Sequence, residues 1–133
     1  MYLDMDRFKS INDSLGHHVG DGLLKEVASR LRHSVRDSDV AARMGGDEFV
    51  VMLADIELSA VGKVADNILN KLGATYYIDG HELHSSPSIG VALFPDDAQS
   101  GDQLMKRADE AMYRAKTAGR NRVEFSNADF MAG

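Results

Sequence analysis

The chain contains no cysteine among its 133 residues, so disulfide bonds and cysteine-ligated zinc are excluded. No apolar run approaches the roughly 18 residues that a membrane-spanning helix requires, and no signal peptide is visible. These absences are compatible with a cytoplasmic location. A longer parent protein could still be attached to a membrane through a domain that this chain does not contain.

An excess of positive charge is also absent. The sequence has 21 acidic and 15 basic residues, which gives a net charge of −6. Because nucleic acids attract basic surfaces, this balance argues against non-specific binding, and we expect no nucleic-acid partner. The composition, 44% hydrophobic and 27% charged, is that of an ordinary globular domain, and the length suits a single domain with its own core.

Apolar periodicity predicts that strands and helices alternate along the chain. We expect strands at residues 2–5, 40–44, 49–53, 75–78, 81–84, 88–94 and 122–125. We expect helices at residues 6–15, 22–35, 58–72 and 100–118, with a loop at 16–21 and a C-terminal tail at 126–133. This order predicts an α+β fold of the ferredoxin-like kind, in which helices flank a central, mostly antiparallel sheet.

The five residues from Gly45 to Phe49 spell Gly-Gly-Asp-Glu-Phe between two predicted strands. Paired glycines supply the positive φ angles of a primed hairpin turn. Two carboxylates, Asp47 and Glu48, follow directly, and glycines let a bulky ligand approach the backbone. Since Gly and Asp are also common in ordinary turns, this motif alone does not establish a function.

Two further carboxylates, Asp4 and Asp6, flank the junction between the first predicted strand and helix. Asp6 is suited to capping that helix, whereas Asp4 at a strand end is typical of cation binding. The helix start also offers free N–H groups to phosphate oxygens. If neighbouring strands bring Asp4 together with Asp47 and Glu48, the carboxylates would repel one another unless cations lay between them. The residues therefore predict metal-dependent phosphate chemistry.

Several other polar residues have simple structural interpretations. The adjacent histidines His17 and His18 lack the i,i+4 spacing of helical metal ligands, so a solvated or capping role is favoured. Arg30 is assigned to a solvated helix face, and Arg36 with Asp39 to a surface ion pair. Cations near a helix C-terminus, here Lys116 and Arg120, stabilise the helix dipole.

In combination, these motifs resemble the GGDEF family of diguanylate cyclases from about residue 3 to residue 123. Besides Gly45 to Phe49, the matching blocks are Asp4-Met5-Asp6-Arg7-Phe8-Lys9, Ile11-Asn12-Asp13, Gly16-His17, Gly20-Asp21, Ser88-Ile89-Gly90, Ala108-Asp109, Ala111-Met112-Tyr113, Ala115-Lys116 and Gly119-Arg120-Asn121. So many blocks in the same order make chance agreement implausible.

The resemblance implies a nucleotidyl-cyclase-like fold and a reaction that condenses two GTP into cyclic di-GMP with release of two pyrophosphates. The resemblance also implies an antiparallel homodimer with one GTP held by each subunit. Two Mg²⁺ ions per active site, with Mn²⁺ as a substitute, are expected at Asp4, the Met5 carbonyl, Asp47 and Glu48. Asp47 and Glu48 are also the expected catalytic residues, with Glu48 adding to metal binding or proton removal.

The resemblance also assigns GTP contacts. Asn12 and Asp21 match the positions that bind the guanine edge. Space for the nucleotide and contacts to its phosphates are expected from Gly45, Gly46, Phe8, Lys9, Lys116 and Arg120. Arg36 and Asp39 occupy the spacing of the family's inhibitory product site, so cyclic di-GMP is expected as an inhibitor as well as a product.

Members of the family usually carry a helix and lead-in before the first strand, which this chain lacks. We therefore expect residues 1–125 to be one domain of a longer protein with sensory or phosphodiesterase domains. The alternative is a non-catalytic module that binds GTP or cyclic di-GMP, a state usually marked by a degenerate glycine-acid motif. Here the motif is intact, which favours the enzyme. A nucleotidyl-transfer palm acting on DNA has little support from the acidic charge.

Overall fold

The computed structural model describes residues 1–127. Within this part of the chain the elements follow in the order β1 (Tyr2–Met5), α1 (Phe8–Leu15), α2 (His17–Ser34), β2 (Val40–Gly45), β3 (Glu48–Met52), α3 (Leu58–Leu72), β4 (Tyr76–Ile78), β5 (His81–Leu83), β6 (Pro87–Val91), α4 (Gly101–Thr117) and β7 (Arg122–Phe125). None of these helices is both long enough and apolar enough to span a membrane.

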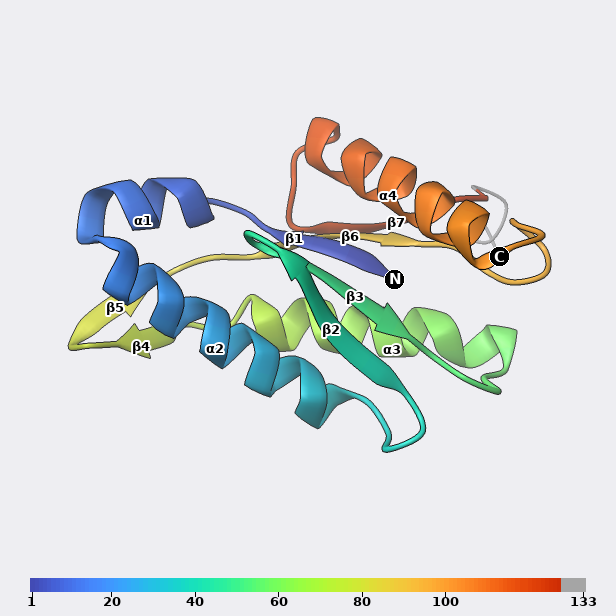
Figure 1. Ribbon diagram of the computed structural model, residues 1–133, viewed down its shortest axis with the longest axis horizontal. Coiled ribbons are helices and arrows are strands. Elements are labelled where there is room, and N and C mark those ends of the chain that lie inside the picture. The colour runs from blue at the N-terminus through green and yellow to red at the C-terminus, as the bar shows by residue number, and fades with distance from the viewer. Residues whose placement is uncertain (128–133) are drawn as a thin grey trace.

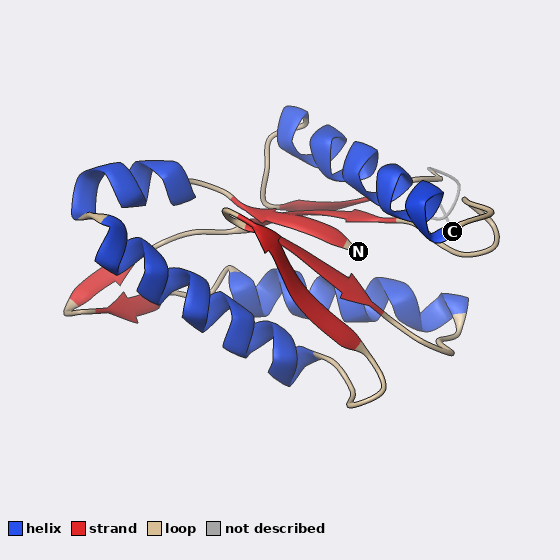
Figure 2. Ribbon diagram, in the orientation of Figure 1, coloured by secondary structure: helices blue, strands red, loops and turns tan. Residues whose placement is uncertain are grey.

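One five-stranded sheet, in the order β2-β3-β1-β6-β7, organises the fold. Neighbouring strands are antiparallel except β6 and β7, which run parallel, and β4 and β5 form a separate hairpin. Helix α4 covers one face of the sheet, and α2 and α3 lie against the other (Figures 1 and 2). The predicted α+β fold, with a mostly antiparallel sheet flanked by helices, is confirmed.

Strand register places the main core between the sheet and helices α2 and α3. Leu3 of β1 lies opposite Phe49 of β3 and Ile89 of β6, and all three side chains are fully buried. The next position along β6, Gly90, faces α4 instead. A Cβ on Gly90 would lie 2.0 Å from the Ala108 carbonyl oxygen, so only glycine lets the helix approach this closely.

The prediction of a loop at residues 16–21 is wrong, because α2 already begins at His17. Gly16, with φ of +94°, ends α1, and its carbonyl accepts the first hydrogen bond of α2 from the Gly20 N–H. Gly20 and Gly22 serve close packing inside the helix: an added Cβ would lie 2.3 Å from Asn12 Oδ1 at Gly20, and 2.6 Å from Ile78 Cγ2 at Gly22.

Two other sequence predictions are corrected at the ends of elements. Strand β6 stops at Val91 rather than residue 94, because the Leu93 N–H is bonded to Asp97 Oδ2 at 2.8 Å. The start of α1 is not capped by a side chain, and its N-cap residue is Arg7. The remaining predicted elements agree to within two residues. Of the expected tail, residues 128–133 lie outside the described part of the chain.

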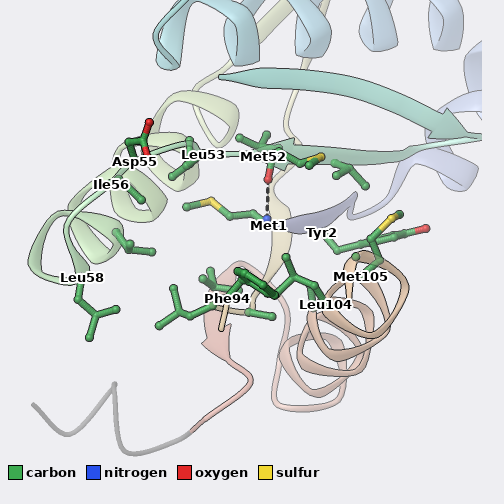
Figure 3. Close-up of a pocket in the computed structure, with 18 of the residues that line it drawn as sticks. Met1, Tyr2, Met52, Leu53, Asp55, Ile56, Leu58, Phe94, Leu104 and Met105 are labelled. Atoms are coloured by element: carbon green, nitrogen blue, oxygen red, sulfur yellow. Dashed lines mark hydrogen bonds between the residues drawn. The ribbon is translucent and has the colours of Figure 1, made fainter. Parts of the chain in front are cut away.

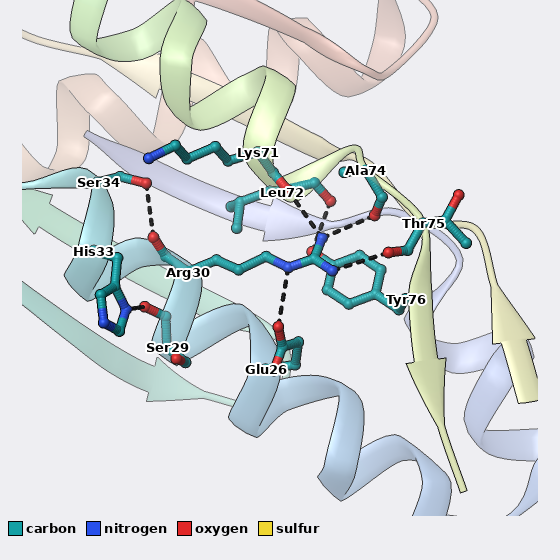
Figure 4. Close-up of polar contacts among 10 residues, drawn as sticks. All are labelled: Glu26, Ser29, Arg30, His33, Ser34, Lys71, Leu72, Ala74, Thr75 and Tyr76. Carbon is teal, nitrogen blue, oxygen red and sulfur yellow. Dashed lines mark hydrogen bonds and ion pairs between the residues drawn. The ribbon is translucent and has the colours of Figure 1, made fainter. Parts of the chain in front are cut away.

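Arg30 is not part of a solvated face, contrary to the sequence prediction. Its guanidinium donates to the carbonyl oxygens of Lys71, Ala74 and Thr75 at 2.8–2.9 Å and lies 3.7 Å from the centre of the Tyr76 ring (Figure 4). This clamp fastens the end of α3 and the start of β4 to α2. The sequence signal was local to one helix, whereas the partners lie 41 to 45 residues away.

Candidate functional site

The predicted glycine-acid hairpin lies beside the C-terminal end of β1. Gly45 pairs with Glu48, leaving Gly46 and Asp47 as the central turn residues, and Gly46 has φ of +52°. Asp4 lies opposite Glu48 in the β1–β3 register, and the Met5 N–H donates to the Asp47 carbonyl at 3.3 Å. Neighbouring strands thus bring Asp4 and the hairpin carboxylates together, which was the condition that the sequence left open.

The backbone around the paired glycines is open on its outer side. A Cβ added to Gly45 or Gly46 would meet no atom within 4 Å, although φ angles of +152° and +52° would strain any other residue. Arg43 donates through Nε to the Gly46 carbonyl at 2.8 Å and so braces the turn. The sequence pattern had not predicted this role for Arg43. The hairpin tip is therefore a fixed backbone that a ligand can approach closely.

Asp4 is enclosed at this site, with only 5% of its surface exposed. Its Oδ2 accepts a hydrogen bond from Lys116 Nζ at the end of α4. Burial, together with the neighbouring Asp47 side chain, raises the pKa of Asp4 to about 6, and Lys116 opposes that rise. The resemblance assigns Lys116 to a phosphate. In this structure its ammonium group forms an ion pair with the buried Asp4 carboxylate.

The raised pKa of Asp4 predicts a pH dependence of stability. Because the pKa is 3.8 unfolded and about 6 folded, the folded state retains the proton longer between these values. The contribution of Asp4 to the free energy of unfolding should therefore fall as pH rises from 3.8 to about 6 and stay low above that range. Urea unfolding without metal should show this fall in the wild type relative to Asp4→Asn. Parallel pH profiles would contradict the prediction.

Glu48 is oriented by Tyr2, for which the sequence predicted a place in the first strand but no role at the site. The Tyr2 hydroxyl donates to Glu48 Oε2 at 2.9 Å, and burial followed by that contact raises the pKa of Tyr2 to about 12. Asp109 of α4 also lies near Glu48. Burial and the Glu48 carboxylate raise the pKa of Asp109. Tyr2 is two residues from Asp4 on one strand, hence on the same face, and this spacing was the available signal.

Asp6 connects three segments of the chain next to the site through its carboxylate. Its carboxylate accepts hydrogen bonds from Ser86 Oγ at 3.0 Å, Ser88 Oγ at 2.8 Å and the Asn121 N–H at 3.2 Å. These bonds tie the end of β1 to the start of β6 and to the α4–β7 connection. The predicted capping role is wrong because the carboxylate turns inward to these three partners.

The residues expected to bind guanine lie on α1 and α2. Asn12 packs against Gly20, the residue before Asp21, and its Nδ2 lies 2.8 Å from His17 Nδ1. His17 is therefore bonded to a predicted site residue rather than only solvated. His18 does fit the solvated interpretation, because its side chain is 92% exposed and forms an ion pair with Asp79 at 3.3 Å.

The residues assigned to phosphate lie at two helix ends. Phe8 and Lys9 form the first turn of α1, where Phe8 packs against the core and Lys9 is exposed. Arg120 follows α4 with φ of +64°, and its N–H donates to the Ala115 carbonyl at 2.9 Å. Its side chain is exposed.

Arg36 and Asp39 form the predicted surface ion pair, with Arg36 Nε 3.4 Å from Asp39 Oδ2. Both also bind the backbone of Ala54, through the Arg36 guanidinium at 2.6 Å and Asp39 Oδ1 at 3.1 Å. Burial alone would raise the pKa of Asp39, but hydrogen bonds from Ala54 and Arg36 outweigh it and lower that pKa. The Arg36 side chain remains 57% exposed.

The described residues offer a partial set of metal ligands. No group of three or more Asp, Glu or His side chains among residues 1–127 surrounds a common point. Asp4 and Asp47 nonetheless fit a divalent ion, because Mg²⁺ typically takes one or two carboxylates and completes its shell with substrate phosphates. A cation bound between them would offset the effect of the Asp47 side chain on the pKa of Asp4.

A pocket of about 600 Å³ lies between the start of β1, the end of β3, α3 and α4 (Figure 3). Its lining is mainly apolar and includes Met52, Leu58, Phe94 and Met105. Neither Asp4 nor Asp47 lines it. The candidate site is therefore the hairpin tip with Asp4 and Asp47, rather than this pocket.

Comparison with known proteins gives a consistent family. Residues 1–122 match the family model described as "Diguanylate cyclase, GGDEF domain". The chain is 46% identical over 121 residues to the bifunctional diguanylate cyclase/cyclic di-GMP phosphodiesterase MucR of Pseudomonas aeruginosa, covering 91% of this chain and 18% of MucR. It is 44% identical to the cyclic di-GMP phosphodiesterase NbdA of the same organism, covering 94% of this chain and 16% of NbdA.

Solved structures show the same similarity in three dimensions. The GGDEF domain of TpbB from Pseudomonas aeruginosa superposes with a TM-score of 0.91 at 41% identity, covering 98% of this chain and 77% of that one. The GGDEF domain of DgcB from Caulobacter crescentus, solved in complex with c-di-GMP, gives 0.85 at 32% identity, covering 94% and 75%. The chain thus spans less than a fifth of MucR and NbdA but most of these isolated domains.

Proposed function

Because the chain belongs to the GGDEF family, we propose that it is a diguanylate cyclase domain that condenses two GTP into cyclic di-GMP and two pyrophosphates. The observation that carries this proposal is the β1–β3 register, which sets Asp4 beside the hairpin carboxylates under an open glycine turn. Lys116 adds a cation at the same place. This combination suits a nucleoside triphosphate with its metal.

In the proposed reaction the 3′-hydroxyl of one GTP attacks the α-phosphorus of the other. The bond from that phosphorus to the bridging oxygen breaks, and pyrophosphate leaves. Since each chain holds one nucleotide, the reacting groups meet in an antiparallel homodimer. Glu48, oriented by Tyr2, is proposed to take part in removing the hydroxyl proton.

The family generally uses divalent metal ions, and we propose that two Mg²⁺ are held by Asp4, the Met5 carbonyl, Asp47 and Glu48. Bound divalent ions would stabilise the attacking and leaving oxygens together. We further propose that Lys116 turns from Asp4 to the terminal phosphate once a nucleotide is present, with Arg120 beside it. Phe8 and Lys9 serve the phosphates through the N–H groups that start α1.

Binding of GTP tests this proposal without requiring turnover. 3′-Deoxy-GTP lacks the attacking hydroxyl, so calorimetric titration in Mg²⁺ measures binding alone. The proposal expects saturable binding of 3′-deoxy-GTP and weaker binding of 3′-deoxy-ATP. A protein that binds neither nucleotide in Mg²⁺ would not be a cyclase.

A second function has a specific observation in its favour. NbdA, a relative at 44% identity, is named a cyclic di-GMP phosphodiesterase. The domain could accordingly act as a GTP-binding or cyclic di-GMP-binding module that regulates a neighbouring phosphodiesterase domain. A GTP-binding module would bind 3′-deoxy-GTP, a cyclic di-GMP-binding module would bind that dinucleotide, and neither would form product from GTP. Since the chain is a small part of its curated relatives' length, further domains in the parent protein are part of both proposals.

We also propose that Arg36 and Asp39 form an inhibitory site for cyclic di-GMP. Nε and Nη2 of Arg36 donate to Asp39 and Ala54, so the exposed guanidinium would meet a phosphate or a guanine edge through its Nη1 N–H groups or by leaving these partners. Arg36→Ala should weaken cyclic di-GMP binding about tenfold and leave 3′-deoxy-GTP binding unchanged. The exposed Arg32→Ala is the matched control. Equal product affinity in both variants, measured by calorimetry, would remove this site.

A further inference from the structure

We propose that His17 determines base specificity by fixing the orientation of the Asn12 amide. The inference rests on the proposed function, since it concerns how the same site selects guanine over adenine. His17 acts through Asn12 and is therefore a positioning residue. Three features carry the inference: one hydrogen bond, one missing side chain, and the position of Asp21.

The hydrogen bond defines the state of His17. Asn12 Nδ2 lies 2.8 Å from His17 Nδ1, and an amide nitrogen can only donate. Nδ1 must therefore accept, which requires a neutral imidazole with its proton on Nε2. The contact uses one of the two N–H donors of the Asn12 amide and so turns its NH₂ group toward His17.

The absence of a side chain at Gly20 provides room for the acceptor end. Asn12 Oδ1 lies 2.3 Å from the position that a Gly20 Cβ would take, and the Phe8 ring is 3.5 Å from that same position. The amide oxygen thus packs against the Gly20 backbone, and Gly20 is the residue directly before Asp21. His17 at one end and Gly20 at the other hold the amide in one of its two orientations.

This orientation suits guanine. The Asn12 oxygen and the Asp21 carboxylate are both acceptors, and guanine presents donors at N1 and N2, whereas adenine has an acceptor at N1 and no amino group at C2. A reversed amide would direct its NH₂ group toward the guanine donors and match the N1 acceptor of adenine. His17 thereby excludes the orientation that would admit the wrong base.

The test compares substitutions of matched shape at two adjacent histidines. His17→Leu keeps the branching but removes the acceptor, while His17→Asn places an amide oxygen near the position of Nδ1. His18→Leu is the control, because His18 is exposed and contacts Asp79 instead. The affinities of 3′-deoxy-GTP and 3′-deoxy-ATP in Mg²⁺ give the guanine-to-adenine ratio for each protein.

We expect that ratio to fall about tenfold in His17→Leu, to recover in His17→Asn, and to stay at the wild-type value in His18→Leu. A wild-type ratio in His17→Leu would overturn the role of His17 while leaving the cyclase proposal intact. A wild-type protein that binds no 3′-deoxy-GTP would overturn both.

Nitrogen NMR of the wild-type protein provides a readout that does not depend on nucleotide. Long-range ¹H–¹⁵N correlations should show His17 Nδ1 without a proton and Nε2 with one. A His17 protonated at Nδ1 when neutral would overturn the proposal, because Asn12 could not then donate to it.

Discussion

Replacement of Gly90 by alanine is expected to destabilise the domain by ~3 kcal/mol or more. The new methyl group would lie 2.0 Å from the Ala108 carbonyl oxygen and 2.2 Å from the Met112 nitrogen. Both are backbone atoms of α4, so no side-chain rotation relieves the clash. Because β6 lies between β1 and β7, the strand cannot move away either. The helix that carries Lys116 would have to shift off the sheet.

Urea unfolding of Gly90→Ala beside Gly62→Ala measures this effect. Gly62 lies inside α3, where an added Cβ would meet no atom within 4 Å. Gly62→Ala should therefore raise stability by roughly 0.5–1 kcal/mol, the ordinary gain of alanine over glycine in a helix. If Gly90→Ala is as stable as the wild type, the close contact between α4 and β6 is wrong.

Replacement of Lys116 by methionine is expected to lower the free energy of unfolding by about 2 kcal/mol in metal-free buffer. The Asp4 carboxylate is enclosed, and Lys116 is the cation that contacts it. An enclosed charge without its partner is costly. The Lys116 side chain is 28% exposed, so the loss should be smaller than for a fully buried pair.

The same substitution should strengthen binding of a divalent ion in the absence of nucleotide. Lys116 and a metal compete for the Asp4 carboxylate, and methionine removes the competitor. Mn²⁺ titration followed by electron paramagnetic resonance would measure this change, with Lys106→Met, an exposed lysine of the same helix, as control. Equal stability and equal Mn²⁺ affinity in the two variants would contradict the pairing of Lys116 with Asp4.

The sequence predicted the parts of the fold that depend on local pattern. The turn at Asp79–Gly80 lies where it was predicted, and the first strand and α3 have their predicted bounds. The turn expected at the paired glycines lies one residue later, at Gly46 and Asp47, because Gly45 still pairs with Glu48 as the last residue of β2. The loop prediction at residues 16–21 failed because glycine can serve either a turn or a close contact. At Gly20 and Gly22 the deciding neighbours, Asn12 and Ile78, belong to other elements.

In the candidate site, too, features set by local sequence could be predicted, and features set by distant contacts could not. The sequence placed Asp4 at a strand end and Asp47 and Glu48 at a hairpin tip, but it did not predict which strands are neighbours. The β1–β3 pairing in the structure sets Asp4 opposite Glu48. The inward turn of Asp6 could not be predicted, because its partners lie 80 to 115 residues away. Tyr2 was missed for a related reason: a tyrosine within a strand is most often a packing residue, and only its contact with Glu48 reveals more.

The most direct test of the account is product analysis after incubation of concentrated protein with GTP and Mg²⁺, with Asp47→Ala in parallel. Chromatography and mass spectrometry would identify cyclic di-GMP and count the pyrophosphate released. The account predicts cyclic di-GMP with two pyrophosphates per molecule from the wild type and none from Asp47→Ala. A wild-type protein that binds 3′-deoxy-GTP yet forms no cyclic di-GMP would contradict the cyclase and favour the regulatory module.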